Sequence, residues 1–327
     1  MAQTKSDVAD SYYSATRKAI QPSVVDNFFE NYNLVALHRR RGMSMTDDGG
    51  PEIQVILEGS GGTAEAFSQF DTLSKSPINP FQSAFYQRRY YAVPMILADT
   101  DNWENAGKEK VFDLMNALGN NAMNTLLKAI NEDIAGAQSG KNMLGYQDLI
   151  ADATGATIGG INSGTQTFWE SQRDTGSATF TSQTVTNIFD GVDKWQDLLD
   201  LCRIQGGNNN VLATTYSIVK AYRISVNSQG YGELNASNAK GLGGAMEPRF
   251  YGSEVIADND IKALATYAID TDAIKLNVLR GANFRKTPFV SLQPNGQLAQ
   301  LAYMIAGVQL TTNNRRRSGV ATAITGA

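Results

Sequence analysis

The side chains that could carry chemistry are few and lie far apart along the chain. Residues Gly136–Asn142 read Gly-Ala-Gln-Ser-Gly-Lys-Asn, which approaches a phosphate-binding loop but is one residue short and lacks the final Ser or Thr. Asp99 and Asp101 have the opening spacing of a calcium loop, yet Trp103 and Glu104 stand where that loop needs an oxygen ligand and a glycine. A helix cap explains the two aspartates better than a cation site.

The other candidates favour structural roles. The single histidine, His38, has no cysteine or second histidine with which to build a metal site or a triad, so we expect it in a subunit contact. Cys202 falls on the apolar face of an expected helix and is assigned to the core. Asp258–Asp260 and Asp270–Asp272 read as turns between strands, with surface cation binding as the alternative. We therefore predict no catalytic residue, no cofactor and no metal, and hence no enzyme.

Two runs of three arginines stand beside segments expected to be extended, in a chain with only 18% charged residues. They can be solvated charges, pair with acids of a neighbouring subunit, or face packaged phosphate. We treat all six as candidate inter-subunit contacts. The two runs are Arg39, Arg40 and Arg41, and Arg315, Arg316 and Arg317.

The composition excludes several classes of protein. The 327 residues are 42% hydrophobic, which is enough for a large core and argues against disorder or a coiled-coil polymer. Lysine and arginine number 28 against 32 acids, so the net charge of −4 excludes a protein that binds nucleic acid over its whole surface. One cysteine allows no internal disulfide, and no apolar run resembles a signal peptide or a membrane span. We expect a soluble protein made in the cytoplasm.

One long helix is expected at Asp99–Ala137, with apolar residues at the three-and-four spacing of a single face. At about 1.5 Å per residue it would be roughly 55 Å long. A helix of this length between extended segments favours a flat or L-shaped subunit that tiles. The alternative is an ordinary long helix in a large globular enzyme. The apolar residues are Trp103, Val111, Phe112, Met115, Leu118, Met123, Leu126, Leu127, Ile130 and Ile134.

The residues before this helix read as an arm and a ribbon. Phe28 and Phe29 lie on the apolar face of a helix at Gln21–Tyr32 that has no local partner, and Asn33–Gly42 is expected to be an extended lead-out. Ile53, Val55 and Leu57 alternate as in a strand, and the run Phe81–Leu97 returns from a tip that carries Lys75. Together they predict a two-stranded ribbon of roughly 50 Å per arm at ~3.3 Å per residue. Such a ribbon is marginal alone and must be covered.

The residues after the long helix predict an α/β block and then a returning sheet. The block contains a helix at Ser182–Ile204, a buried strand at Asn210–Thr214, a helix at Thr215–Ser225 and a strand at Pro248–Ile256. The returning segments are Ala263–Ile269, Ile274–Leu279, Pro288–Leu292, Gln297–Leu310 (helix or strand) and Gly319–Ile324.

This order of parts resembles the major capsid proteins of tailed bacteriophages, whose Johnson (Hong Kong 97-like) fold is shared with encapsulins and herpesvirus capsid floors. Local phrases are similar too. Gly159-Gly160-Ile161 running on to Phe168-Trp169 resembles the segment after the family's spine helix. Asn210–Tyr222 resembles the core of its A-domain, and Gly307–Leu310 with Arg315–Val320 resembles its closing strand pair.

The resemblance implies an α+β chain with five parts. They are an N-arm at 1–48, an E-loop ribbon at 49–98, a P-domain with its spine helix at 99–180, an A-domain at 181–262 and returning strands of both domains at 263–327.

The resemblance also implies a function. Copies would form the hexamers and pentamers of an icosahedral phage head that encloses double-stranded DNA without reading its sequence. Further expected partners are a portal and separate scaffolding or decoration proteins, with no membrane, and the location is the virion after assembly in the host cytoplasm. The alternatives are an encapsulin-type compartment shell and, from another class, a soluble metabolic enzyme. On this resemblance Phe28, Phe29 and Lys75 join the arginines as candidate inter-subunit contacts.

We predict that assembled subunits are not covalently crosslinked. One branch of the family joins subunits through a ribbon-tip lysine and a glutamate on a late strand. Lys75 fits the first role, but Leu301–Leu310 contains no acid. Assembled material should run on a denaturing gel as one band at the subunit mass, and a ladder of covalent oligomers would contradict this.

Overall fold

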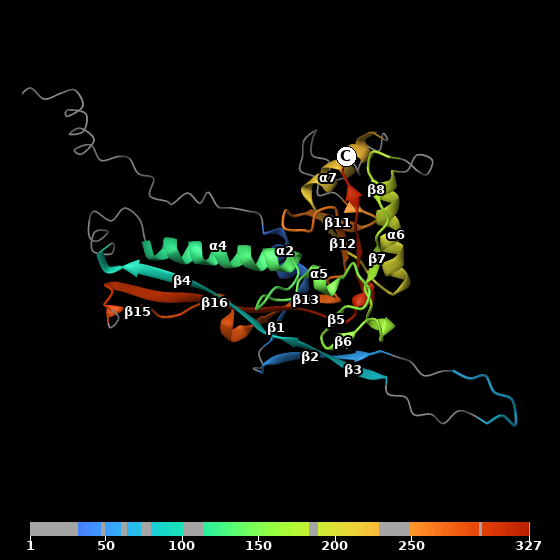
Figure 1. Cartoon of the computed structure of the whole chain (residues 1–327), viewed down its shortest axis with the longest axis horizontal. Coiled ribbons are helices and arrows are strands. Elements are labelled where there is room, and N and C mark those ends of the chain that lie inside the picture. Colours follow the sequence, from blue (N-terminus) through green and yellow to red (C-terminus); the bar gives the residue numbers. More distant parts are fainter. Residues whose placement is uncertain are drawn as a thin grey trace, which may run out of the picture. The chain divides into compact units, whose positions relative to one another are not determined.

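The computed structural model forms two compact units, each with its own internal packing (Figure 1). The smaller unit includes Val93–Asn124 and Lys286–Met304, and the larger includes Asn31–Ala92, Thr125–Arg285 and Ile305–Ala327. Three elements begin in one unit and end in the other: β4 (Arg89–Ala98), α4 (Leu114–Ala135) and β16 (Ala299–Thr312). The described residues are 32–46, 50–59, 64–72, 80–100, 114–182, 189–228, 249–293 and 296–326.

A six-stranded mixed sheet in the larger unit carries the α/β block. The predicted strand is present as β9 and is buried along its whole length, as its apolar sequence Val-Leu-Ala-Thr requires. β11 runs parallel to β9, and β12 runs antiparallel to it. The strand order is β10 (Arg249–Phe250), β11 (Ser253–Ala257), β9 (Val211–Thr214), β12 (Thr266–Ile269), β17 (Gly319–Ala321) and β7 (Gln172–Asp174).

Two helices, α6 (Asp190–Ile204) and α7 (Tyr216–Ser228), pack on this sheet through a shared apolar core. Trp195 of α6 lies 5.0 Å from Tyr222 of α7 and 5.5 Å from Phe250, measured between ring centroids. Cys202 is buried in the same cluster, as predicted. The predicted helix at Ser182–Ile204 begins only at Asp190, and residues 183–188 lie outside the described part of the chain.

The segment before β1 is helical, so the predicted extended lead-out is wrong. Residues Asn33–Leu37 form α2, and His38–Gly42 continue as a π-helix, η1. Leu34, Val35 and Leu37 are buried in this turn. A helix is favoured here because it turns these three side chains toward one partner surface, and that surface is distant in sequence.

The long helix is described from Leu114 to Ala135, and residues 101–113 lie outside the described part. It ends at Ala135, two residues before the expected end at Ala137. The backbone N–H of Gln147 in α5 (Tyr146–Leu149) donates to the carbonyl oxygen of Gly136, so the start of α5 meets the end of α4. This junction leaves no room for a side chain at Gly145.

A second sheet contains the returning strands, and Gln297–Leu310 is resolved as strand. β1 (Met43–Thr46) pairs in parallel with β13 (Ile274–Leu279), and β13 pairs antiparallel with β16. β13 has the predicted bounds. β16 also pairs with β14 (Arg285–Lys286), β15 (Val290–Ser291) and β4.

The ribbon is present but shorter than predicted within the described residues. β2 (Glu52–Glu58) and β3 (Phe81–Gln87) pair antiparallel over seven residues, or ~23 Å at ~3.3 Å per residue. The run expected to reach Leu97 divides at Arg88, because β4 leaves the ribbon and pairs with β16. Lys75, which was expected at the tip of the ribbon, is one of residues 73–79, which lie outside the described part.

The remaining elements are short, and four of them form two small sheets, β5 with β6 and β8 with β18. They are β5 (Thr157–Ile158), β6 (Ile161–Asn162), η3 (Thr167–Trp169), β8 (Ala178–Thr179), η4 (Arg280–Ala282), η6 (Arg315–Arg317) and β18 (Ile324–Thr325).

The junction between α4 and α5 predicts opposite effects for two glycine substitutions. Gly145→Ala should lower the free energy of unfolding by ~1–3 kcal/mol, because a Cβ there would overlap the carbonyl oxygens of Gly136 and Asp133. Gly119→Ala, inside α4 with no atom near its Cβ position, should raise that free energy by ~0.5–1 kcal/mol. Urea unfolding measures both. Equal effects of the two substitutions would contradict this account of the junction.

Candidate assembly surfaces

The ribbon has one face against its own chain. Alternation along β2 and β3 places Leu57, Ala84 and Tyr86 on this face, and all three are buried. The Tyr86 hydroxyl donates to the carbonyl oxygen of Thr312 at 3.0 Å, and the backbone N–H of Phe85 donates to that of Gly159 at 3.0 Å. The ribbon is therefore anchored along one side by both apolar packing and hydrogen bonds.

The opposite face carries large apolar side chains in contact with solvent. Ile56 is 72% exposed and Phe81 is 62% exposed, and Phe85 lies on the same face. The polar side chains of Gln54 and Glu58 lie beside them on this same face. Exposed aromatic rings continue beyond the ribbon, where Phe70 is 94% exposed. We call Ile56, Phe81 and Phe85 the outer ribbon face.

The residues that precede β1 are held by polar anchors. The Arg40 and Arg41 guanidiniums reach the two carboxylate oxygens of buried Glu254 in β11, at 2.7 and 3.0 Å. Arg39 is exposed. His38 is fully buried, and its Nε2 lies 2.6 Å from the Tyr146 hydroxyl, so the expectation of a subunit contact for His38 is wrong.

Asn131 of α4 is a further anchor. Its side-chain oxygen accepts the backbone N–H groups of Leu34 and Val35, and its amide donates to the carboxylates of Asp258 and Asp260. Burial raises the pKa of Asp258. The backbone N–H of Asp260 donates to Asp258, which confirms the predicted turn. The start of α2 is thus tied to α4 and to the end of β11.

The second arginine run has three different environments. Arg315 is buried and donates to the carbonyl oxygens of Leu149, Trp169 and Asp148 at 2.8, 3.1 and 3.1 Å. Burial lowers the pKa of Arg315 to about 10, so the guanidinium stays charged at neutral pH. Arg317 pairs with buried Asp270 at 2.8 Å.

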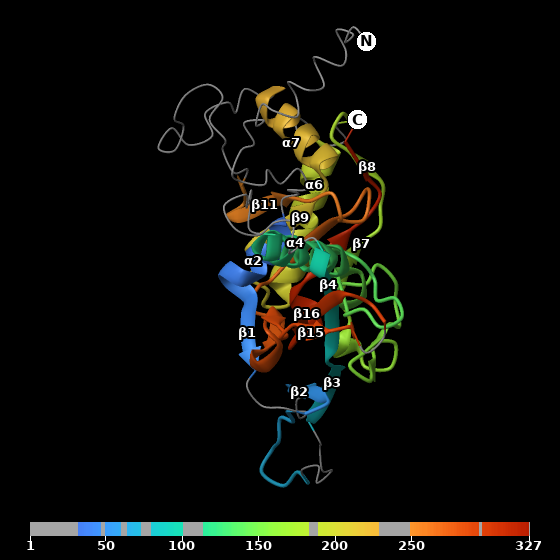
Figure 2. The same cartoon turned by 90° about the vertical axis from the view of Figure 1, so that its left-hand side faces the viewer.

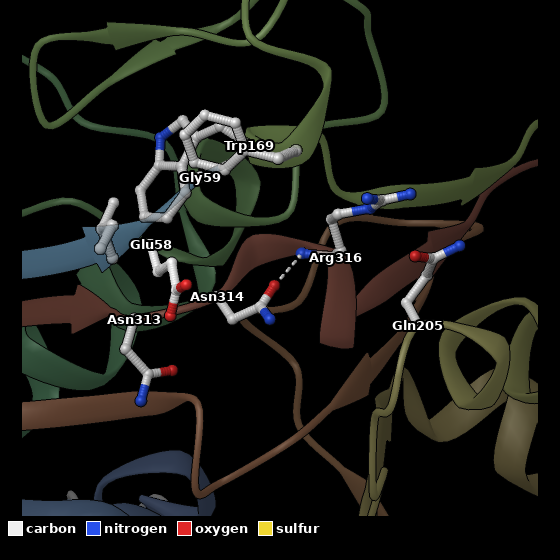
Figure 3. A pocket seen from close by; sticks show the side chains of 9 residues that line it. Glu58, Gly59, Trp169, Gln205, Asn313, Asn314 and Arg316 are labelled. Atoms are coloured by element: carbon white, nitrogen blue, oxygen red, sulfur yellow. Dashed lines mark hydrogen bonds between the residues drawn. The ribbon is translucent and has the colours of Figure 1, made fainter. Parts of the chain in front are cut away.

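Half-buried Arg316 lines a pocket of about 230 Å³ beside the C-terminal end of β2 (Figure 3). The pocket mixes the Phe168 ring with charged and amide side chains, so it suits a polar segment better than a single apolar side chain. Its other lining residues are Leu57, Glu58, Gly59, Trp169, Gln205, Asn313 and Asn314.

Sequence reasoning located only part of these surfaces. Phe28, Phe29 and Lys75 lie outside the described residues, so their assignment stays a prediction. Sequence reasoning missed Glu254 and Asn131 as polar anchors, because both stand in ordinary strand and helix patterns. It also missed Ile56, Phe81 and Phe85 as a surface, although their alternation with buried residues carries the signal.

Two further observations concern the described residues. None of their helices is both long and apolar enough to cross a membrane. No group of three or more His, Cys, Asp or Glu side chains within the described ranges is arranged to hold a metal ion.

The fold is similar to that of solved capsid proteins. No protein-family model and no curated protein matches the sequence. Among solved structures, the chain is similar to the capsid asymmetric unit of cyanophage A-1(L), at TM-score 0.75 and 15% identity over 95% of this chain and 98% of that one. The capsid of the native GTA particle matches at TM-score 0.67 and 13% identity over 99% and 100%.

An encapsulin also shares the architecture. The holo-SrpI encapsulin complex of Synechococcus elongatus PCC 7942 matches at TM-score 0.61 and 9% identity over 100% and 98%. The fold is therefore the Hong Kong 97-like (Johnson) fold of phage capsid proteins, and it is α+β as predicted. Its similarity to the cyanophage A-1(L) capsid subunit runs through nearly the whole length of both chains.

Alanine substitutions of Arg315 and Arg316 should differ sharply in their effect on the free energy of unfolding. Arg315→Ala should lower the free energy of unfolding by ~3 kcal/mol or more, because it leaves buried carbonyl oxygens without a donor. Arg316→Ala should change it by less than ~0.5 kcal/mol. Urea titration followed by circular dichroism compares them, and similar losses for both variants would contradict the buried role of Arg315.

Proposed function

We propose that the protein is a major capsid protein, whose copies form hexamers and pentamers and close into an icosahedral shell around double-stranded DNA. The observation that carries the proposal is the outer ribbon face, which a subunit with a capsid fold leaves uncovered. The fold supplies the architecture, and the exposed apolar side chains supply the reason to associate.

The outer ribbon face can drive association at a useful strength. Burying one large apolar side chain fully is worth ~1.5–3 kcal/mol. Burial of Ile56, Phe81 and Phe85 together would thus contribute several kcal/mol of association free energy. Part of this is offset by the translational and rotational freedom that the subunits lose on binding. In the shell a neighbouring copy covers this face, and the ribbon becomes stable through that contact.

The arm and the arginines act in the same assembly. Residues 1–48 serve as the N-arm, with Phe28 and Phe29 packing on a neighbouring copy, and Lys75 lies at the ribbon tip without forming a crosslink. Arg39 and Arg316 are the members of the two runs without an ion pair to the described residues, and each faces an acid of a neighbour or packaged phosphate. Arg40 and Arg41 hold η1, where the proposed N-arm leads into β1, through their ion pairs with Glu254.

The remaining segments follow the same assignment, with the ribbon at 49–98, the P-domain at 99–180, the A-domain at 181–262 and returning strands at 263–327. The expected location is the virion, assembled in the host cytoplasm with a portal and separate scaffolding or decoration proteins.

An encapsulin-type shell is the second candidate, because the SrpI encapsulin shares the fold over both full chains. The two candidates differ in cargo. Particles purified from their source should contain nuclease-protected DNA if the protein is a phage capsid subunit, and an enclosed enzyme if it is a compartment shell.

The outer ribbon face provides the test of the proposal. Wild-type protein should form closed particles in electron micrographs. A variant with Ile56→Ser, Phe81→Ser and Phe85→Ser should form none, while its free energy of unfolding stays within ~1 kcal/mol of wild type, because these side chains are exposed in the lone subunit.

Gln54→Ser with Gln87→Ser is the matched control, since these polar residues lie on the same face. The control should assemble at wild-type yield. A wild-type chain that stays monomeric by light scattering would overturn the proposed function, and a triple variant that assembles normally would remove the role of the ribbon face.

A further inference from the structure

The outward side of α6 carries a stripe of acids that ends in an isoleucine. Asp193, Asp197, Asp200 and Ile204 follow one another at intervals of four, three and four residues, which places them on one side of the helix. Asp197 and Asp200 are exposed, and Ile204 is 76% exposed. We call these four residues the acidic stripe.

The outward side of α7 carries the opposite charge. Tyr216, Lys220 and Arg223 follow at intervals of four and three, and Ile224 lies beside Arg223. All four are exposed, Ile224 by 58%. Lys220 and Arg223 form no ion pair with any residue in the part of the chain that is described. We call these four residues the basic stripe.

The two stripes lie over different ends of one sheet. α6 packs on β7 and β17, at one end of the strand order, and α7 packs on β11 near the other end. Both helices send their aromatic side chains, Trp195 and Tyr222, into the shared core, so both stripes face away from it. Figure 1 shows the two helices as separate rods beside the strands of this sheet, and Figure 2 shows the same elements from the side. A subunit therefore presents acid at one flank and base at the other.

The acidic stripe is self-repelling in the lone subunit. The pKa of Asp197 is raised by partial burial and by the charges of Asp193, Asp174 and Asp200. Lys194 is buried behind the stripe, where its ammonium group pairs with Asp174 and donates to the carbonyl oxygen of Thr322. The Arg203 guanidinium lies 3.6 Å from the carboxylate of Asp200. A further cation supplied from outside would relieve this repulsion.

We propose that the acidic stripe of one copy docks on the basic stripe of a second copy of this chain. The proposal rests on the proposed shell function and names the contact that orients neighbours within a ring. Each stripe ends in an exposed isoleucine, so ion pairs at the centre are joined by apolar burial of Ile204 and Ile224. Because the two patches differ, the contact is head-to-tail, and such contacts close into rings when the rotation between copies permits.

Charge reversal on each stripe, alone and together, tests this contact in the full-length chain. Asp197→Lys with Asp200→Lys, or Lys220→Glu with Arg223→Glu, should each reduce particle yield at least about tenfold, because like charges then oppose each other. The variant with all four changes has the wild-type net charge of −4 and should recover most of the yield. Lys141→Glu, at an exposed loop residue away from both stripes, is the control and should assemble normally.

Sedimentation and electron microscopy measure the yield, and circular dichroism at each step verifies that the subunit is folded. Recovery of particle yield in the fourfold variant supports the contact. If the two reversals acted by damaging the fold, their losses of yield would add up in the fourfold variant instead of cancelling. If wild-type particles form and either reversal alone assembles at wild-type yield, or the fourfold variant remains defective while folded, this contact is wrong and the shell function stands. Where a reversal variant does not fold, Asp197→Asn with Asp200→Asn should still show a reduced yield, and a wild-type yield would again overturn the contact.

Discussion

The two-residue period of the β-strand is the constraint on which the rest of this structure depends. In β2 and β3 it assigns Leu57, Ala84 and Tyr86 to one face and Ile56, Phe81 and Phe85 to the other. Within the described residues only the first of these faces is packed against the rest of the subunit. In the proposed shell, a neighbouring copy covers the second.

This constraint explains why the inner side of the ribbon is anchored so firmly. An exposed apolar face favours non-specific association unless the strand that carries it has a defined orientation. The hydrogen bonds from Tyr86 to Thr312 and from Phe85 to Gly159 set that orientation within the larger unit. Asn131 and Glu254 act in the same way on α2 and η1. Polar anchors inside the subunit thus determine where its apolar surfaces point.

Local periodicity predicted the elements whose partners are close in sequence or whose pattern is unambiguous. The strands β9 and β13, the apolar face of α6 and, within two residues, the end of α4 were all evident. Asn33–Gly42 was predicted wrongly because the side chain that accepts the backbone N–H groups of Leu34 and Val35 is that of Asn131, about one hundred positions away. The break at Arg88 was not evident because both halves of the run favour strand, and only the pairing of β4 with β16 distinguishes them.

The arginine run at 315–317 shows why a candidate site is harder to predict than a fold. Composition treats the three residues alike, but η6 is a 3₁₀ turn, in which successive side chains point about 120° apart. One guanidinium must therefore enter the core, and Arg315 does so because three carbonyl oxygens accept from it. Arg317 pairs with Asp270, and Arg316 lines the pocket beside the end of β2. A run of equal charges is thus divided by backbone geometry into one structural cation, one ion pair and one group available to a neighbour.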